Sequence, residues 1–549
     1  MIAEVIVDIT SGETDRVFDY LCDGDTQVGA RVLAPFGPRM LTGFVVRLKE
    51  ASDFDASRLK KIRPTDDGLP ALTEECVELA QKIAKRYAVP LALSLRLFLP
   101  SEMRTGKVRE LYRRYAALAV SLGEITLPKT AKNQQSAVEY LAVNGKTDCA
   151  LLNKQFPGSV TALEKKGYIT VTTEQIKRDP YKTVEGEAPV RTLTAAQEKA
   201  VEYVKTDART VQLIHGVTGS GKTEIYLTVI AECLRQGKSS IFLVPEIALT
   251  PQMLSQLRAR FGKNAAILHS GLSAGERFDE WWRLRTGEAK IAIGARSAVF
   301  APLENLGVII LDEEHDGSYH SETSPRYSTF EVAKLRAKHH GCKLVLGSAT
   351  PAVETYQKAL KGEFGLITLK KRINKRPMPE IQIVDMRREA RRGNNSPFSD
   401  TLKDEIEACL AAEKQAILFL NRRGYAQSVI CKDCGTVVKC DACDVSLTYH
   451  REENCLKCHY CGEKYEMVDG CVACGSKKLS YAGTGTQKIV SELQKLYPTA
   501  RILRMDNDTT SGKEGHYKIL KSFAKLLFCA CVYLLVHQWF LLLVMLKKW

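Results

Sequence analysis

The segment HGVTGSGKTEIY, residues 215–226, constrains the fold of this chain more than any other segment. It follows the apolar run VQLI and precedes an amphipathic stretch, so a strand, a glycine-rich loop and a helix are predicted in that order. The backbone amides of such a loop can surround phosphate oxygens, and the helix N-terminus adds a favourable dipole. Lys222 can reach the β and γ phosphates of ATP, and the Thr223 hydroxyl can hold Mg²⁺. The predicted nucleotide-binding residues are Gly216, Val217, Thr218, Gly219, Ser220, Gly221, Lys222 and Thr223.

Short apolar segments alternate with amphipathic stretches around this loop. The first series of apolar segments is VQLIHG, SSIFLVPE, AAILHS, AKIAIGA, LGVIILDEE and CKLVLGSAT. Continuous β-branched segments separated by helices are typical of a parallel sheet that is covered on both faces. A second series starts near IQIVDM and continues with QAILFLNRRGY and ARILRMD. The sequence therefore predicts two α/β lobes, at residues 190–370 and 371–525.

Two carboxylates complete the predicted catalytic set. Asp312 and Glu313 directly follow the apolar strand VIIL. One carboxylate is expected to orient Mg²⁺ through its water shell, and the other to position and deprotonate the attacking water. The predicted catalytic residues are therefore Lys222, Asp312 and Glu313. Upstream, in LTAAQ, Gln197 is predicted to contact the adenine edge of ATP.

Nine of the 17 cysteines lie between Cys431 and Cys474, inside the second lobe. Each Cys-x2-Cys pair can hold one side of a tetrahedral zinc, so four pairs predict two closed, structural sites in an inserted module, residues 428–478. Disulfides are the alternative, which a reducing compartment disfavours. Cys455 forms a competing pair with Cys458. The four pairs are Cys431/Cys434, Cys440/Cys443, Cys458/Cys461 and Cys471/Cys474.

The segments before the phosphate loop predict two smaller domains. Residues 1–105 open with AEVIVDI, RVLAPFG and LTGFVVRLKE, whose alternation and Gly/Pro punctuation are typical of a small β domain, and a helical stretch follows. Residues 112–180 predict a helix in KNQQSAVEYLAVNG, then a second helix and a β segment in GSVTALEKKGYITVTTEQIK. This order predicts a winged helix, and a small helical linker domain is the alternative.

The formal net charge of +15 favours a polyanionic partner. Lysines and arginines that displace counterions from phosphates supply most of the non-specific affinity for nucleic acid. A basic enzyme without such a partner is the alternative. The first residues, MIAEVIVDITSGETD, lack the basic and apolar regions of a signal peptide, so a cytoplasmic protein is predicted.

Six segments follow one another in an order that resembles the motifs of superfamily 2 helicases. They are the phosphate loop, LVPEIALTPQ, GARSAVFAP, DEEH, GSATP and LFLNRRGY. The resemblance implies two RecA-like lobes that use ATP and Mg²⁺. In GSATP, Ser348 and Thr350 are expected to link the hydrolysis site to the second lobe. Between DEEH and GSATP, the rings of Tyr319, Tyr327 and Phe330 are predicted to stack on unpaired bases.

The cysteine module after LFLNRRGY narrows the resemblance to the bacterial replication-restart, or primosomal, helicases, over residues 1 to about 525. The segments RVFDYL and APFG resemble that family's pocket for the 3′ end of a nascent DNA strand. The resemblance therefore implies a DNA-binding set in the N-terminal domain that consists of Phe18, Asp19, Tyr20, Gly37 and Lys60.

The same resemblance implies further properties. Two Zn²⁺ ions are expected. One is bound by Cys431, Cys434, Cys471 and Cys474, and the other is bound by Cys440, Cys443, Cys458 and Cys461. The implied activity is ATP-dependent 3′–5′ unwinding at abandoned or stalled replication forks, followed by reloading of the replicative helicase. The implied partners are branched and single-stranded DNA, other primosome proteins, single-stranded-DNA-binding protein and the replicative helicase.

The last 24 residues, 526–549, contain eight leucines and no Gly, Pro, Ser, Thr, Asn, Asp, Glu or Arg. The resemblance implies that the second lobe continues with a Q-x2-GR-x2-R motif, whose arginine reaches the γ phosphate, and none follows Lys525. We therefore expect a shifted reading frame and a truncated, motor-defective chain that is poorly soluble because its apolar tail has no sheet to join. A non-catalytic fork-binding scaffold and a membrane-tethered ATPase are the alternatives.

Overall fold

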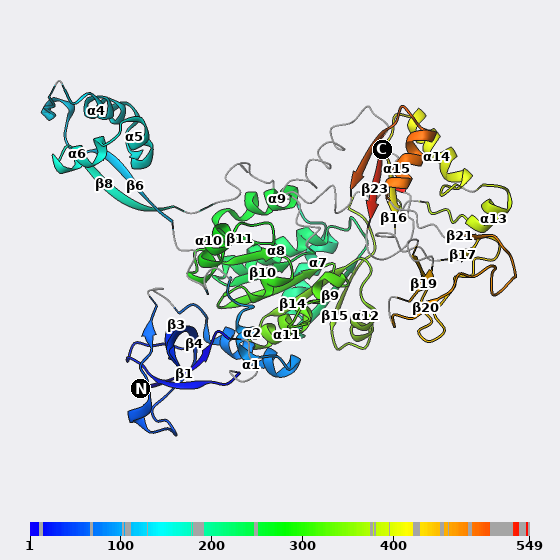
Figure 1. Ribbon diagram of the computed structural model, residues 1–549, viewed down its shortest axis with the longest axis horizontal. Coiled ribbons are helices and arrows are strands. Elements are labelled where there is room, and N and C mark those ends of the chain that lie inside the picture. Colours follow the sequence, from blue (N-terminus) through cyan, green and yellow to red (C-terminus); the bar gives the residue numbers. More distant parts are fainter. Residues whose placement is uncertain are drawn as a thin grey trace. The chain divides into compact units, whose positions relative to one another are not determined.

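The computed structural model describes two compact units, Met1–Arg376 and Pro377–Trp549 (Figure 1). The described residues are 1–9, 15–65, 70–100, 104, 111–128, 130–176, 178, 192–245, 251–373, 377, 380–394, 396–420, 429–450, 455–458, 461–480, 486–505, 531–536 and 545–546. Parts of two predicted helicase segments, LVPEIALTPQ and LFLNRRGY, lie outside this range, as does most of the C-terminal tail.

The chain begins with an antiparallel sheet that closes on itself. Its strand order is β2-β1-β4-β3-β5. A parallel bridge joins Leu21 of β2 to Lys61, and the Leu21 amide donates to the Lys60 carbonyl at 2.9 Å, so the two edges meet and form a small barrel. This sheet confirms the predicted β domain. The strands are β1 (Ile2–Val7), β2 (Phe18–Leu21), β3 (Arg31–Phe36), β4 (Arg39–Lys49) and β5 (Arg63–Pro64).

Two helices follow the barrel, α1 (Glu74–Tyr87) and α2 (Leu91–Leu95). The side chain of Thr73 caps α1 by accepting a hydrogen bond from the Cys76 amide. Alternation along the barrel strands sends some side chains inward and others, such as Ile6 and Phe44, outward into a core shared with α1 and α2. That core continues into the next domain, so the barrel and the first lobe share apolar packing.

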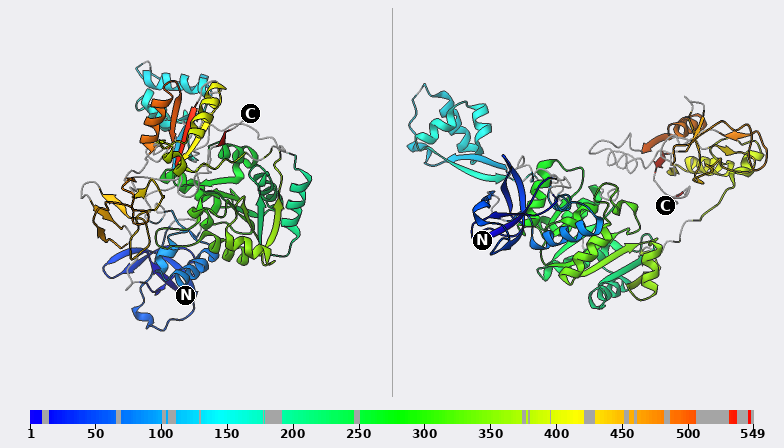
Figure 2. Two further views of the ribbon diagram at one scale, coloured as in Figure 1. Left: turned by 90° about the vertical axis from the view of Figure 1, so that its right-hand side faces the viewer. Right: turned by 60° about the horizontal axis from the view of Figure 1, so that its bottom comes forward.

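The first lobe contains a seven-stranded sheet of order β11-β12-β10-β13-β14-β9-β15, in which every pair is parallel. All six predicted strands are confirmed, and a seventh, β15, was not predicted. Helices cover both faces (Figures 1 and 2). The strands are β9 (Val211–Gly216), β10 (Ser239–Leu243), β11 (Ala265–Leu268), β12 (Ile291–Gly294), β13 (Leu306–Asp312), β14 (Lys343–Ser348) and β15 (Gly365–Leu369).

Alternate side chains of these strands enter two different cores. Leu213, Ile309 and Leu344 pack with α10, α11 and the N-terminal helices, whereas Ile214 and Ile310 pack with α7, α8 and α9. Burial on both faces explains the continuous apolar segments in the sequence. The helices are α7 (Ala195–Thr206), α8 (Lys222–Arg235), α9 (Pro251–Phe261), α10 (Ala274–Arg285), α11 (Thr329–His340) and α12 (Val353–Leu360).

Residues 111–176 form a separate small core of three helices and a three-stranded antiparallel sheet of order β7-β6-β8. Helices and a small antiparallel sheet are the elements that a winged helix needs, and the winged-helix assignment stays a prediction. Its first strand, β6, was missed because LYRRYAAL lacks clear alternation. The elements are β6 (Leu111–Leu118), α4 (Lys132–Asn144), β7 (Thr147–Asp148), α5 (Cys149–Gln155), α6 (Ser159–Lys165) and β8 (Ile169–Ile176).

The second unit contains a four-stranded sheet of order β22-β23-β16-β24. Strands at QAILFL and RILRM are confirmed. The predicted strand at IQIVDM is wrong, because residues 381–385 form no strand and α13 begins at Met386. The elements are α13 (Met386–Arg391), α14 (Asp400–Ala411), β16 (Ala416–Leu420), α15 (Thr486–Leu496), β22 (Arg501–Met505), β23 (Cys531–Val536) and β24 (Met545–Leu546).

The apolar tail does join a sheet, so the prediction that it would not is wrong. Strand β23 pairs in parallel with both β16 and β22, and β24 pairs antiparallel with β16. A run of β-branched and aromatic residues can serve as a central strand whatever its origin. Within the described residues, no helix is long and apolar enough to cross a membrane.

The cysteine module consists of short antiparallel pairs. Strand β17 (Ile430–Cys431) pairs with β21 (Leu479–Ser480), so the start and end of the module lie side by side. Between them, a three-stranded sheet is formed by β18 (Thr448–His450), β19 (Cys455–Lys457) and β20 (Lys464–Tyr465).

Candidate functional site

The phosphate loop has the backbone that its sequence predicts. Gly219 and Gly221 have φ angles of +82° and +80°, which L side chains rarely adopt. A Cβ on Gly216 would lie 2.6 Å from the Ser220 hydroxyl, so this glycine is required by close approach. The loop therefore curls between β9 and α8 in the form that can surround phosphate oxygens.

Lys222 lies inside this curl. Its Nζ donates to the Gly216 carbonyl at 2.9 Å, and the residue is buried. The buried hydroxyl of Ser220 has no hydrogen-bond partner among the described residues. A phosphate oxygen would satisfy Ser220, and the exposed Thr223 hydroxyl at the start of α8 is of the type that holds Mg²⁺. The donor set therefore fits a nucleotide phosphate with its metal ion.

Gln197 forms hydrogen bonds to the phosphate loop in this structure. Its Nε2 donates to the carbonyls of Gly221 (3.2 Å) and Ser220 (3.4 Å), while its Oε1 accepts from the Thr194 amide at 2.8 Å. Both ends of the amide are thus occupied within the protein. The contact of this side chain with an adenine edge stays a prediction.

The acidic pair lies two strands away from the loop. Strands β13, β14 and β9 are adjacent and parallel, so the phosphate loop, Ser348 and Asp312 come together at one edge of the sheet. Burial, and secondly the charge of Glu313, raise the pKa of Asp312 to about 6 against the opposing effect of Lys222. A buried carboxylate with a raised pKa gains from a nearby cation, which again fits Mg²⁺. Glu313 has a φ of +47°, an uncommon backbone that directs the chain after the strand.

His315 was missed from the sequence, although it belongs to the same segment. Its Nδ1 lies 2.8 Å from the Ser348 hydroxyl and 3.7 Å from Glu313 Oε2. The Ser348 hydroxyl also accepts from the Thr350 amide at 2.9 Å. The acidic segment and the GSATP segment are therefore joined by side-chain contacts inside the first lobe.

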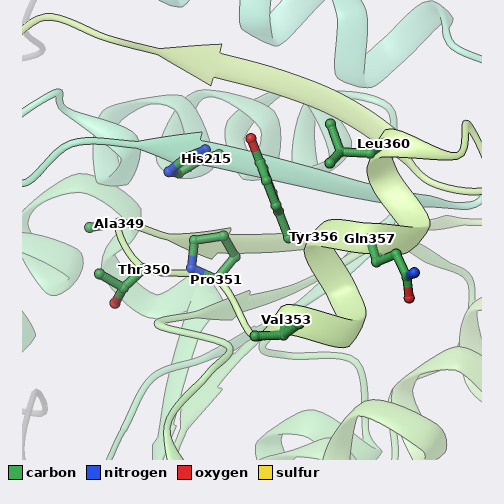
Figure 3. A pocket seen from close by; sticks show the side chains of 8 residues that line it. All are labelled: His215, Ala349, Thr350, Pro351, Val353, Tyr356, Gln357 and Leu360. Atoms are coloured by element: carbon green, nitrogen blue, oxygen red, sulfur yellow. The ribbon is translucent and has the colours of Figure 1, made fainter.

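A pocket of about 510 Å³ opens beside this network, between the end of β9 and α12 (Figure 3). The rings of His215 and Tyr356 meet edge to face in it, with centroids 5.3 Å apart. No residue of the phosphate loop or the acidic pair lines it, so it is distinct from the nucleotide site.

The aromatic residues between DEEH and GSATP are not placed for stacking on bases. Tyr319 is 2% exposed and its hydroxyl donates to the Asp312 carbonyl at 2.7 Å. Tyr327 is 4% exposed and packs edge to face on Phe300. Phe330 is half-buried and packs near Phe364. The predicted DNA contacts of Tyr319 and Tyr327 are therefore corrected to packing and hydrogen-bonding roles, because a composition rich in aromatics does not show which rings are exposed.

The barrel divides the predicted DNA-binding residues between two faces of β2. Phe18 and Tyr20 point toward the interior, where Phe18 packs edge to face on Phe36 at 5.3 Å, next to Gly37. Tyr20 is buried, and its hydroxyl donates to the Pro35 carbonyl at 3.2 Å, so its predicted contact with DNA is corrected to a core position. Gly37 has a φ of +57° and open space around it, and Lys60 is exposed.

Asp19 lies on the outer face of β2. Lys49 Nζ approaches its Oδ2 at 2.8 Å and Glu4 Oε1 at 3.1 Å, and the Ser52 hydroxyl donates to the same Asp19 oxygen. Burial by itself would raise the pKa of Asp19, but the hydrogen bonds from Lys49 and Ser52 outweigh it and lower the pKa. This carboxylate is therefore an ionised hydrogen-bond acceptor at neutral pH.

The eight paired cysteines form two clusters, and the pairing that the resemblance implies is confirmed. In each cluster, all four sulfurs lie within 4.8 Å of one another, with pairs such as Cys431 and Cys474 at 3.6 Å and Cys440 and Cys461 at 3.7 Å. Zinc–sulfur bonds of about 2.3 Å in a tetrahedron place sulfurs roughly 3.8 Å apart, so both sets fit Zn²⁺. Cys458, not Cys455, belongs to the inner cluster, and the two clusters are Cys431, Cys434, Cys471 and Cys474, and Cys440, Cys443, Cys458 and Cys461.

Each cysteine pair is built as the same turn. The residue after the second cysteine donates its amide to the carbonyl of the first, at 2.9 Å in all four turns. That residue has a positive φ each time. The four positions and their φ angles are Gly435 (+78°), Asp444 (+53°), Gly462 (+81°) and Gly475 (+67°).

Comparisons with known proteins agree with this arrangement. Residues 4–100 match the 3'DNA-binding domain (3'BD) family, residues 194–359 the DEAD/DEAH box helicase family, and residues 440–464 the PriA DNA helicase Cys-rich region (CRR) domain. The chain is 40% identical to the replication restart protein PriA of Bacillus subtilis, over 95% of this chain and 75% of that protein. It is 34% identical to PriA of Haemophilus influenzae over 91% and 69%, and 41% identical to PriA of Synechocystis over 67% and 45%. The chain therefore belongs to the PriA family of replication restart proteins, which are ATP-dependent DNA helicases.

Proposed function

We propose that the first lobe of this chain binds and hydrolyses Mg-ATP with Lys222, Asp312 and Glu313 as its catalytic residues. The observation that carries the proposal is the convergence of the phosphate loop, Ser348 and Asp312 at one edge of three adjacent parallel strands. Lys222 binds the phosphate that is transferred, in place of its present contact with Gly216. Thr223 and Asp312 would hold the Mg²⁺ that accompanies ATP, and this ion would neutralise charge on the phosphates.

Glu313 positions the attacking water and accepts its proton. Glu313 directly follows Asp312 and has a positive φ, and we assign the two carboxylates different roles. His315 and Ser348 then couple the acidic segment to the GSATP segment.

The test of this site uses the full chain and isothermal titration with ATP in the presence of Mg²⁺. Lys222→Ala is expected to abolish measurable binding, because the phosphate loses its buried cation. Glu313→Gln is expected to retain affinity and to lose hydrolysis by about two orders of magnitude or more. Unchanged ATP affinity in the Lys222→Ala variant would overturn the assignment.

We further propose that the barrel recognises a free 3′ end at a branched or stalled fork, that unwinding runs 3′ to 5′ in the cytoplasm, and that the replicative helicase is then reloaded. The support is the matched 3′ DNA-binding family and the ionised Asp19, which can accept a hydrogen bond from a 3′ hydroxyl. Phe18 lies on the interior face of β2 and contributes through the packing of that strand, whereas the exposed Lys60 can supply a cation. The proposed protein partners are other primosome proteins, single-stranded-DNA-binding protein and the replicative helicase.

The matching experiment compares Asp19→Asn and wild-type chains on forks that end in a 3′ hydroxyl or a 3′ phosphate. The substitution is expected to weaken binding to the 3′-hydroxyl fork and to leave plain duplex binding unchanged. An equal loss on all substrates would show that the pocket lies elsewhere.

A fork-binding form that holds ATP without stepping is the second candidate function. The observation that favours it is the composition of residues 526–549, part of which occupies the centre of the second sheet as β23. The test replaces residues 526–549 with the corresponding segment of the B. subtilis relative and compares DNA-stimulated hydrolysis. Equal turnover by the two chains would exclude this second candidate.

A further inference from the structure

Helix α13 of the second unit carries three arginines, and a fourth directly follows it, in the segment MRREARR. Arg387, Arg388, Arg391 and Arg392 are all exposed, whereas Glu389 is buried and accepts from the Asp400 amide. The buried glutamate attaches the helix to the start of α14. The exposed arginines are therefore held on an ordered element, and they have no role in the core.

This basic helix lies against the outer zinc turn. Arg391 Nη2 donates to the Asp433 carbonyl at 3.3 Å, and the stem of Arg387 lies 3.3 Å from where a Cβ on Gly435 would stand. Lys432 donates its amide to the Lys478 carbonyl, which brings two exposed lysines to the same turn. Figure 1 shows α13 beside β17 and β21, in agreement with these contacts.

The charges of this surface do not cancel. Three carboxylates oppose the positive side chains: the buried Glu389, Asp385, which accepts from Arg387, and Asp433, which lies 3.7 Å from Lys478. A zinc ion with four thiolates contributes a formal charge of about −2. The six positive charges of this surface outnumber the negative charges of the carboxylates and the zinc site taken together. Neutralising the zinc site therefore does not account for all of them, which are Arg387, Arg388, Arg391, Arg392, Lys432 and Lys478.

We propose that this surface, named here the knuckle face and consisting of those six residues, binds the phosphate backbone of DNA. Guanidinium groups at i and i+4 on one helix can contact successive phosphates, and such contacts need no base sequence. The knuckle face would give the second unit its own DNA-binding surface, in addition to that of the barrel in the first unit. Each phosphate contact that is lost should lower the slope of log affinity against log salt by about 0.9.

The test measures binding of the full chain to a forked DNA by fluorescence anisotropy over a series of salt concentrations. Arg388→Glu combined with Arg392→Glu is expected to weaken binding and to lower the salt slope by about two. The control is Lys361→Glu combined with Lys495→Glu, which makes the same charge change at exposed lysines elsewhere. Retention of two zinc ions per chain checks that the module is folded. Equal affinity and slope in the two double variants would overturn the proposal.

A different observation concerns Asp312. The hydroxyl of Tyr226, one turn after Lys222 on α8, donates to Asp312 Oδ1 at 3.1 Å. This ring is completely buried, and it reaches the carboxylate only because residue 347 is glycine: a Cβ there would lie 1.6 Å from the hydroxyl. Gly347 pairs with Asp312 across β13 and β14. Three elements therefore combine to fix one carboxylate oxygen.

We infer that Tyr226 is a positioning residue for the metal-binding carboxylate and that Gly347 is required to admit it; this inference rests on the proposed function of Asp312. A carboxylate fixed by a buried donor keeps one oxygen oriented toward the metal shell, and removal of the donor leaves it free to rotate. Loss of a hydrogen bond to a charged group corresponds to about a tenfold change in an equilibrium constant.

The test measures ATP binding by calorimetry as the Mg²⁺ concentration rises. Tyr226→Phe is expected to raise the Mg²⁺ concentration for half-maximal binding about tenfold and to leave Mg²⁺-free binding unchanged. Gly347→Ala should have the same effect, while Tyr203→Phe, in the same lobe, serves as control. An unchanged Mg²⁺ dependence in Tyr226→Phe would overturn this inference. If Lys222→Ala still abolished binding in that case, the proposed function would stand.

Discussion

The guanidinium group of Arg336 makes two parallel hydrogen bonds to the carboxylate of Glu75. Nε lies 2.7 Å from Oε1 and Nη2 lies 2.8 Å from Oε2, although the residues are 261 positions apart. Both side chains are buried, and the remaining donors of Arg336 reach the carbonyls of Val299, Ala301 and Leu303. Helix α1, which follows the barrel, is therefore fixed to α11 of the first lobe by a fully satisfied ion pair.

Glu75→Gln is expected to lower the free energy of unfolding of the first unit by about 3 kcal/mol or more, because it leaves the Arg336 charge buried without its partner. Chemical denaturation followed by tryptophan fluorescence measures this, since Trp281 donates to the Phe98 carbonyl in the same core. The control is Glu78→Gln on the same helix. Its partner Lys82 is about half exposed, so the change should stay within roughly 0.5 kcal/mol. Equal effects of the two substitutions would contradict the role of the buried pair.

The same pair predicts a dependence of stability on pH. Burial would raise the pKa of Glu75, but Arg336 and then His340 outweigh it and lower the pKa to about 2. The carboxylate stabilises the fold fully above its unfolded pKa of roughly 4.3, and this contribution disappears as the pH falls toward 2. The stability difference between wild type and Glu75→Gln should therefore shrink steadily from pH 5 to pH 2. A difference that stays constant over this range would show that the pair is not the cause.

The sequence predicted the strands of the first lobe, the phosphate loop and the zinc ligands, because each depends on neighbours within a few residues. Six strands were predicted from apolar segments, and Gly219 and Gly221 from the loop pattern. The contact of Glu75 with Arg336, and that of Tyr226 with Asp312, depend on how distant segments pack. No local pattern marks such contacts, and the burial of Tyr319 and Tyr327 was missed for the same reason. The contact of Gln197 with the phosphate loop was likewise not predicted.

The zinc turns predict which residues tolerate change. Gly462→Val is expected to lower the zinc content from two ions per chain to one, because a β-branched residue is strained at a φ of +81° in the inner cluster. Asp444→Gly should keep both ions, since Asp444 is the only non-glycine among the four described turn positions and has a φ of +53°. Elemental analysis of purified chains gives both values. Loss of zinc in Asp444→Gly, or full zinc in Gly462→Val, would contradict the role assigned to backbone conformation.

The final prediction concerns strand β23 and tests whether the apolar tail is part of the second sheet. Leu534 pairs with Leu418 of β16 on one side and with Arg504 of β22 on the other. Proline there would remove a backbone donor from the ladder of a central strand, a position in which proline is not tolerated. Leu534→Pro should therefore destabilise the second unit much more than Leu534→Ala, which keeps the amide.

The measurement is hydrogen exchange of the amides of β16 and β22 in the three chains, followed by mass spectrometry. Both strands should lose protection in the proline variant and keep most of it in the alanine variant, because only the proline interrupts the ladder between them. Protection that is equal in the two variants would mean that β16 and β22 do not depend on β23. The tail would then pair with the sheet without stabilising it.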